Sequence, residues 1–238
     1  MNSQRLILLL LCVLIGLQAA TLYRQRHSTI SSQPAEEAAG AAPVTNAPDN
    51  SVLDVRDFPI LGSPETTVVL IEFSDYECPF CARHAMTAFR DLNQAFVSTH
   101  KIRYAFANNP LPIHHSAKLL ATAAICAGQQ GHYWEMHDIL FEATPKTKEQ
   151  VVAAAEQISG IDLKRLTTCI DTDPLPADRI AQDMAQAKAL HLEATPGFVL
   201  GHVDTDNRVI LDKAIIGAQP FHVFQTTINE ILAKREKL

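Results

Sequence analysis

The chain has 238 residues, a length that accommodates one large domain or one domain with an inserted subdomain. Apolar residues make up 47% of it, as in folded proteins, and 20 basic residues against 26 acidic ones give a net charge of −6. This balance and the absence of a basic run give no support to a function in nucleic-acid binding.

The chain begins with an apolar segment, because residues 6–23 contain only two polar side chains. Residues 1–27 are therefore interpreted either as a signal peptide, cleaved near Leu17-Gln18-Ala19, or as an N-terminal membrane anchor. The run of 18 residues is just long enough to cross the hydrocarbon of a bilayer, and we favour the anchor. The remainder is then expected in the periplasm or another extracytoplasmic space, tethered to the inner membrane by residues 6–23.

Two further stretches precede the main part of the chain. Residues 28–50 are rich in Ala, Ser, Thr and Pro and contain no aromatic residue. They cannot bury enough apolar surface to fold, so they are predicted to be a disordered linker. Val52 to Ile60 is predicted to be a short edge strand, because Pro59 near its end lacks the N–H that a central strand would need.

The chain is organised around residues 68–81. This stretch opens with a run of apolar, largely β-branched residues, the pattern of a strand buried on both faces. It closes with Cys78 and Cys81, two cysteines separated by two residues. An apolar stripe with helical spacing follows at once, at Ala85, Phe89, Leu92 and Phe96.

This pattern places Cys78 at the mouth of a helix, with Pro79 at the first helical position, where a missing N–H costs nothing. Unpaired amides and the helix dipole there stabilise a thiolate and lower the pKa of the thiol. Cys78 is therefore predicted to be a nucleophile, and Cys81, one turn later, the resolving cysteine. A zinc site would need a second ligand pair at suitable spacing, which the chain lacks, so no metal is expected.

Glu72 is the only charged residue inside the predicted strand. Burying a carboxyl group without a partner is costly, so the pKa of Glu72 should rise, and the group could relay protons. The alternative is a carboxylate that is satisfied at the rim of the strand.

The rest of the chain reads as one more strand, a helical region and a C-terminal hairpin with a last helix. Ile102 to Ala107 is predicted to be the next strand after the buried strand that begins at Val68, and the helix between them should make a right-handed crossover. From about Pro112 to Leu192 the pattern is helical, which indicates an all-helical subdomain inserted into an α/β domain. A hairpin is predicted from Pro196 to Ile216, and a helix from Phe221 to Lys234.

The helical region contains two further cysteines, Cys126 and Cys169. Since the local pair uses Cys78 and Cys81, these two are predicted to form a second, structural disulfide. The alternative is that both stay free on small-residue or apolar faces of their helices.

Several motifs resemble one family, the DsbA-type thiol–disulfide oxidoreductases of the thioredoxin superfamily. Residues 72–81, which include both clustered cysteines, resemble the active-site segment of that family. The other matching motifs, in the family's order, are residues 130–138, 194–199 and 216–221. The similarity covers about residues 52 to 236.

The resemblance implies a thioredoxin fold formed by residues 51–111 and 190–238, with residues 112–189 as the inserted helical subdomain. Glu72, six residues before Cys78, matches the buried acid of the family. Thr195 and Pro196 resemble the threonine–cis-proline step placed against the cysteine sulfurs. Substrate is expected to contact these two residues together with Pro79 and Phe80.

The implied activity is a dithiol oxidase that introduces disulfides into exported proteins with free thiols, using Cys78 and Cys81. It needs no cofactor beyond this redox-active disulfide, and a membrane oxidase of the DsbB or vitamin-K-epoxide-reductase (VKOR) type would reoxidise it. One alternative is a disulfide reductase or isomerase that uses the same dithiol. An alternative of another class is a non-catalytic peptide-binding adaptor or holdase.

Overall fold

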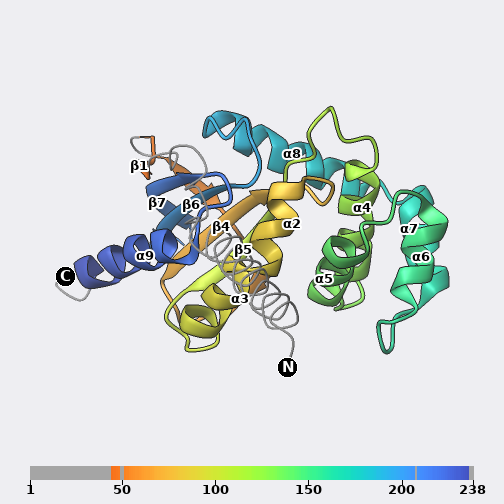
Figure 1. The fold of residues 1–238 in the computed structure, drawn as a ribbon, viewed down its shortest axis with the longest axis horizontal. Coiled ribbons are helices and arrows are strands. Elements are labelled where there is room, and N and C mark those ends of the chain that lie inside the picture. Colours follow the sequence, from red (N-terminus) through yellow and green to blue (C-terminus); the bar gives the residue numbers. More distant parts are fainter. Residues whose placement is uncertain (1–43, 49–50, 207, 236–238) are drawn as a thin grey trace, which may run out of the picture. The chain divides into compact units, whose positions relative to one another are not determined.

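The computed structural model describes residues 44–48, 51–206 and 208–235, and within them a seven-stranded sheet with helices on both faces (Figure 1). The strand order is β1-β7-β6-β4-β5-β3, and β2 also pairs with β7. The strands are β1 Thr45–Asn46, β2 Val52–Asp54, β3 Ile60–Leu61, β4 Val68–Ser74, β5 Arg103–Asn108, β6 Gly197–Val203 and β7 Arg208–Ile216. β4 runs parallel to β5 and antiparallel to β6, so the sheet is mixed.

The helices fall into two groups. Those that follow β4 or end the chain are α2 Pro79–Met86, α3 Ala88–Leu92, the π-helical turn η1 Asn93–Val97, and α9 Phe221–Arg235. Those between β5 and β6 are α4 Ala117–Gly128, α5 Tyr133–Ala143, α6 Lys148–Ala155, α7 Leu163–Thr172 and α8 Leu175–Ala189. In Figure 1, α4 to α7 stand together beside the sheet, so the second group forms a helical insertion in an α/β domain, as the sequence predicts.

β4 is buried on both faces, which confirms the interpretation of its apolar run. On one face Leu70 lies in a core cluster with Leu92 of α3 and Phe224 of α9. On the other face Ile71 lies in a cluster with Leu190, directly after α8. Every side chain at the carboxyl end of this strand is therefore held between two layers, which fixes the start of the segment that carries the cysteines.

The helix after β4 is interrupted, although the sequence pattern predicts one continuous helix. Thr87 leaves helical geometry at φ −126° and ψ −89°, and its Oγ1 donates to the carbonyl oxygen of Arg83 over 2.7 Å. Such back-bonding by a threonine hydroxyl bends helices. The predicted apolar stripe is nevertheless buried at Phe89, Leu92 and Phe96.

The linker prediction for residues 28–50 is wrong for residues 44–48. Thr45 and Asn46 form β1 opposite Ala214 and Lys213 of β7, and the amide of Ala47 continues the pairing. Backbone pairing at a sheet edge needs no apolar side chain, so composition does not reveal it. Residues 28–43, 49 and 50 lie outside the described residues.

The predicted signal peptide or membrane anchor, with its apolar residues 6–23, also lies outside the described residues. Within the described ranges, no helix is both long and apolar enough to cross a membrane.

The single edge strand predicted from Val52 to Ile60 is in fact two strands on opposite edges of the sheet. β2 pairs with β7, whereas β3 pairs with β5. Between them Val55 and Phe58 turn into the core, where they are 2% and 5% exposed. Because these two side chains enter the core, the backbone between β2 and β3 passes from one edge of the sheet to the other, and no single strand spans residues 52–60.

The helical insertion is held by caps and by one disulfide. Thr147 Oγ1 accepts from the amide of Gln150 over 3.3 Å at the start of α6, and Asp162 Oδ1 accepts from that of Arg165 over 2.9 Å at α7. Each cap satisfies an amide that the first helical turn leaves unpaired. A disulfide between Cys126 and Cys169, with an S–S distance of 2.02 Å, joins α4 to α7.

Candidate active site

Cys78 is the N-cap residue of α2, four residues beyond the end of β4. Its amide donates to the carbonyl oxygen of Asp75 over 3.1 Å, and its own carbonyl accepts from the amide of Ala82 over 3.0 Å. Pro79 occupies the first helical position, as the sequence predicts, and no side chain caps the helix. The free amides of the first turn are therefore available to the sulfur of Cys78.

The two thiols are both free and both buried, but their environments drive their pKa values apart. The pKa of Cys78 is lowered to about 5, mainly by its hydrogen bond from the Cys81 thiol. The Thr195 side chain and two helix amides also lower this pKa, whereas burial raises it. Burial raises the pKa of Cys81, and the nearby Cys78 and Glu72 add to this rise. At neutral pH Cys78 is a thiolate and Cys81 a thiol.

The loop between α8 and β6 brings Thr195 and Pro196 to the cysteines. The peptide bond between these two residues is cis. Cys78 Sγ lies 3.5 Å from the carbonyl oxygen of Thr195, although the two residues are 117 positions apart in sequence. The carbonyl of Pro196 accepts from the amide of Gly217 over 2.8 Å, which fixes the loop to the end of β7.

Phe80 is the large apolar side chain exposed beside the cysteines. It is 53% exposed, and the guanidinium of Arg83 lies 5.2 Å from the centre of its ring. Pro79 next to it is also exposed. The four predicted substrate-contact residues differ in exposure: Pro79 and Phe80 follow Cys78 directly and are exposed, whereas Thr195 and Pro196 are buried, with the Thr195 carbonyl beside the Cys78 sulfur.

Glu72 lies on β4 beneath the cysteines, 2% exposed. Its Oε2 accepts from the hydroxyl of Tyr104 on β5, and its Oε1 is buried with no partner among the described residues. Burial raises the pKa of Glu72 to about 7, against the hydrogen bond from Tyr104 and the effect of the nearby Ser74 hydroxyl, which both lower it. A carboxyl group with this pKa can give or take a proton at neutral pH.

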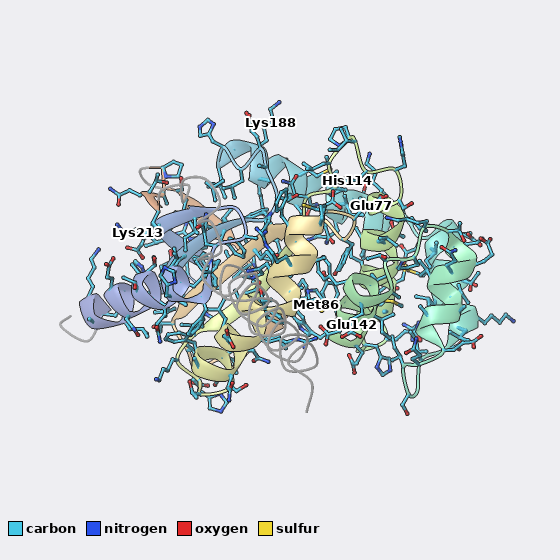
Figure 2. The ribbon with its side chains drawn as sticks, viewed as in Figure 1. Glu77, Met86, His114, Glu142, Lys188 and Lys213 are labelled. Carbon is cyan, nitrogen blue, oxygen red and sulfur yellow. A yellow bond between two sulfur atoms is a disulfide. The ribbon has the colours of Figure 1, made fainter. Side chains whose placement is uncertain are left out.

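Two acidic residues hold the active-site loop to the insertion, and sequence reasoning missed both. Asp75 Oδ2 accepts from the amide of Leu111 and from Nδ1 of His114, each over 2.7 Å. Glu77 accepts from the amide of Ser116 over 2.7 Å and from the Lys146 ammonium over 2.9 Å. Figure 2 labels Glu77 and His114 at this junction. The partners lie more than 30 residues away, so no local signal marks them.

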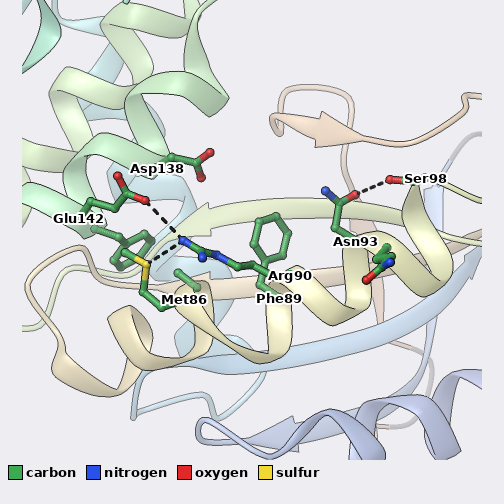
Figure 3. A pocket seen from close by; sticks show the side chains of 10 residues that line it. Met86, Phe89, Arg90, Asn93, Ser98, Asp138 and Glu142 are labelled. Atoms are coloured by element: carbon green, nitrogen blue, oxygen red, sulfur yellow. Dashed lines mark hydrogen bonds and ion pairs between the residues drawn. The ribbon is translucent and has the colours of Figure 1, made fainter. Parts of the chain in front are cut away.

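Two hollows lie away from the cysteines. One of about 340 Å³ separates α2 and α3 from α5, and in it Arg90 donates to the Met86 sulfur and the Glu142 carboxylate, each over 3.4 Å (Figure 3). A larger one of about 770 Å³ is bounded by residues 57–60, α4, α5 and the start of α8. Neither of these two hollows is lined by Cys78 or Cys81.

No group of three or more His, Cys, Asp or Glu side chains is placed to hold a metal ion in the part of the chain that the structure describes. The chemistry that these residues can perform is thiol–disulfide exchange, because one sulfur is a stabilised thiolate and the second lies one helical turn away.

Comparison with known proteins agrees with this chemistry. A family model described as thioredoxin matches residues 55–214. Disulfide bond formation protein D of Bacillus subtilis is 26% identical over 153 residues, which cover 60% of this chain and 67% of that protein. Na(+)/H(+) antiporter NhaA 3 of Salinispora tropica is 31% identical over 163 residues, which cover 67% of this chain. The chain spans 24% of the length of that antiporter.

Among solved structures, oxidised BdbD from Bacillus subtilis superposes with a TM-score of 0.64 and 21% identity, covering 82% of this chain and all of that one. This likeness confirms the predicted thioredoxin fold with a helical insertion. The family match spans well over half of the chain. The chain therefore belongs to the thioredoxin family and has the fold of its DsbA-type members.

Proposed function

We propose that this protein is a thiol–disulfide oxidoreductase that introduces disulfides into exported proteins through Cys78 and Cys81. The observation that supports this best is the placement of Cys78 at the N-terminus of α2, where its pKa is lowered to about 5. Stabilising this thiolate favours the reduced form of the pair. The disulfide form is correspondingly a better oxidant.

In the oxidising direction, a substrate thiolate attacks Sγ of Cys78 in the Cys78–Cys81 disulfide. The bond between the two cysteines breaks, a mixed disulfide with substrate forms, and Cys81 leaves. Because the pKa of Cys81 is raised by burial, its sulfur needs a proton as it leaves, and Glu72 is the buried carboxyl group beside it. A second substrate thiolate then displaces Cys78, so two electrons pass from the substrate to the enzyme's dithiol.

Substrate would bind across the surface around Cys78. The carbonyl of Thr195 is next to the reactive sulfur, and Pro196 after it has no N–H. An extended substrate segment could pair with the backbone of Thr195 while its side chains contact the exposed Phe80 and Pro79. These contacts would hold the mixed disulfide in line with the attacking thiolate. They would discriminate little between substrate side chains, which suits an enzyme with many substrates.

The site of action and the partners belong to the same proposal. The Bacillus relative is named for disulfide bond formation, which agrees with an oxidase working on exported proteins. The apolar residues 6–23 would hold the protein at the inner membrane, facing the periplasm or another extracytoplasmic space. A membrane oxidase of the DsbB or VKOR type would return the dithiol to the disulfide.

The test is oxidative refolding of a reduced, unfolded protein that needs disulfides, such as hirudin, by stoichiometric oxidised enzyme. We expect substrate disulfides to form at the rate at which enzyme thiols appear, and Cys78→Ser to be inactive. Rapid reduction of insulin without oxidation of hirudin would assign the protein as a reductase. Peptide binding that is unchanged in Cys78→Ser, without either exchange reaction, would assign it as an adaptor.

A further inference from the structure

Three buried polar side chains form a chain that leads away from the cysteines. The Tyr104 hydroxyl donates to Oε2 of Glu72, and its oxygen lies 3.3 Å from Nε2 of His84 on α2. The three side chains are at most 2% exposed and come from β4, β5 and α2. Tyr104 and His84 have no part in the reaction described above.

The direction of these hydrogen bonds follows from the number of protons. Tyr104 has one hydroxyl proton, which it gives to Glu72, so its oxygen accepts from an N–H at Nε2 of His84. His84 is neutral, because burial and, to a smaller extent, the nearby His137 lower its pKa to about 3. Its proton is therefore on Nε2, while Nδ1 is buried without a partner among the described residues.

The surroundings of Glu72 contain few other groups that could set its protonation. The titratable groups near it are Tyr104 from β5, Cys81 from α2, Cys78 at the N-cap of α2 and Tyr76 from the loop between β4 and α2. From β6, Phe198 presents only an apolar ring, which packs against His84. Tyr104 is therefore the one neutral donor from a neighbouring strand, and it acts against the burial that pushes the carboxyl group towards its neutral form.

We propose that Tyr104 and His84 are positioning residues that keep Glu72 able to exchange a proton with Cys81 near neutral pH. A hydrogen bond to a carboxylate stabilises its charged form. The His84 N–H polarises the Tyr104 hydroxyl and strengthens its donation, because hydrogen bonds in a low-dielectric chain reinforce one another. The inference rests on the proposed function, since it concerns how Glu72 serves the cysteines.

The step that reports this is resolution of a mixed disulfide between Cys78 and glutathione. The Cys81 thiol loses its proton to the Glu72 carboxylate and attacks Cys78. The Cys78–Cys81 bond forms, the bond to glutathione breaks, and glutathione leaves as a thiolate. Its rate should rise with pH through the pKa of Glu72, near 7, and then level off.

The experiment measures this rate against pH by rapid acid quench and mass spectrometry on the full-length protein. Tyr104→Phe keeps the ring and removes the donor, so the midpoint should move alkaline by about one unit, which lowers the rate at pH 7 about five- to sixfold. His84→Leu should move it the same way by less, about two- to threefold in rate. His84→Gln, which keeps an N–H near the place of Nε2, should restore the wild-type midpoint.

Phe224→Leu is the matched control, because Phe224 packs against His84 in the same core and carries no polar atom. It should leave the midpoint in place even if it loosens the packing. The protonation of Glu72, followed by its infrared carboxyl band, gives a second readout that does not depend on turnover. It should shift in Tyr104→Phe by the same amount as the rate midpoint.

The possible failures are distinguishable. If Glu72→Gln abolishes the pH dependence but Tyr104→Phe leaves the midpoint unchanged, the role of Tyr104 and His84 is overturned and the proposed function stands. If the pH dependence survives in Glu72→Gln, Glu72 is not the proton carrier, and both this inference and its part in the proposed mechanism are overturned.

Discussion

Replacing Phe80 by histidine should make the Cys78–Cys81 disulfide a stronger oxidant. Phe80 lies in the first turn of α2, two residues after the reactive cysteine, and supplies no charge to its sulfur. An imidazolium at this position would favour the thiolate of Cys78. The nearby guanidinium of Arg83, now over the Phe80 ring, would oppose a second positive charge and limit the gain.

The size of the effect follows from the exposure of the site. Because Phe80 is 53% exposed, water screens the interaction, and we expect a fall of about one unit in the pKa of Cys78. The pKa of Cys78, about 5, is already below 7, so the whole shift counts at neutral pH. One unit corresponds to about 1.4 kcal/mol in favour of the reduced form. For a two-electron couple this makes the potential about 30 mV more oxidising.

The assay is equilibration with glutathione buffers at pH 7, with the redox state read by thiol alkylation and mass spectrometry. The pKa of Cys78 is measured on the same samples from the ultraviolet absorbance of the thiolate. Phe80→Leu is the control, since it keeps an apolar side chain and should match the wild-type potential. A fall in the pKa of Cys78 without any change in potential would refute the link between thiolate stability and oxidising power.

Three further predictions concern the other site residues. Cys78→Ser should abolish turnover, whereas Cys81→Ser should accumulate mixed disulfides seen as higher-mass bands that reduction removes; normal turnover by Cys81→Ser would contradict the assigned roles. Replacing both Cys126 and Cys169 by alanine should lower the free energy of unfolding by about 4 kcal/mol, because their disulfide closes a loop of 43 residues. Unchanged thermal stability of that double variant would argue against a structural role. Glu72→Gln, compared in the oxidised form, should be about 3 kcal/mol more stable than wild type at pH 8 and no more stable at pH 4. The sign follows from the pKa of Glu72, which burial raises from 4.5 in the unfolded chain to about 7 in the folded protein. The destabilisation by the buried carboxylate is therefore absent below the unfolded pKa and complete above the folded one. Equal urea midpoints of Glu72→Gln and wild type at pH 8 would contradict this prediction.

The elements predicted correctly from sequence are those whose signal is local. β4 follows from its continuous apolar run, and the hairpin of β6 and β7 and the last helix follow from the pattern of their own residues. The elements that were missed depend on distant partners. β1 exists because β7 offers a free edge, and Val52 to Ile60 divides because two side chains enter the core between the halves.

The break at Thr87 is a case of a local signal that competes with a stronger one. A threonine hydroxyl can bond to the carbonyl four residues earlier, but the apolar stripe on either side of Thr87 favours continuous helix. The stripe fixes which side chains are buried. It does not fix whether the backbone bends between them.

For the site, the nucleophile and the buried acid are visible from sequence because Glu72, Cys78 and Cys81 lie within ten residues at the end of one strand. Tyr104 and His84 are not visible, because a tyrosine in a strand and a histidine in a helix read as ordinary core residues. Only the parallel pairing of β4 with β5 and the packing of α2 on that face bring their polar atoms to the carboxyl group.

The reduction potential of the wild-type Cys78–Cys81 pair tests the central claim most directly. Thioredoxin, a reductant, has a potential of about −270 mV, and DsbA, a strong oxidant, one of about −120 mV. With a stabilised Cys78 thiolate but no charged residue between the cysteines, we expect a value between these limits. A potential at or below that of thioredoxin would contradict the assignment as an oxidase and identify a reductase instead.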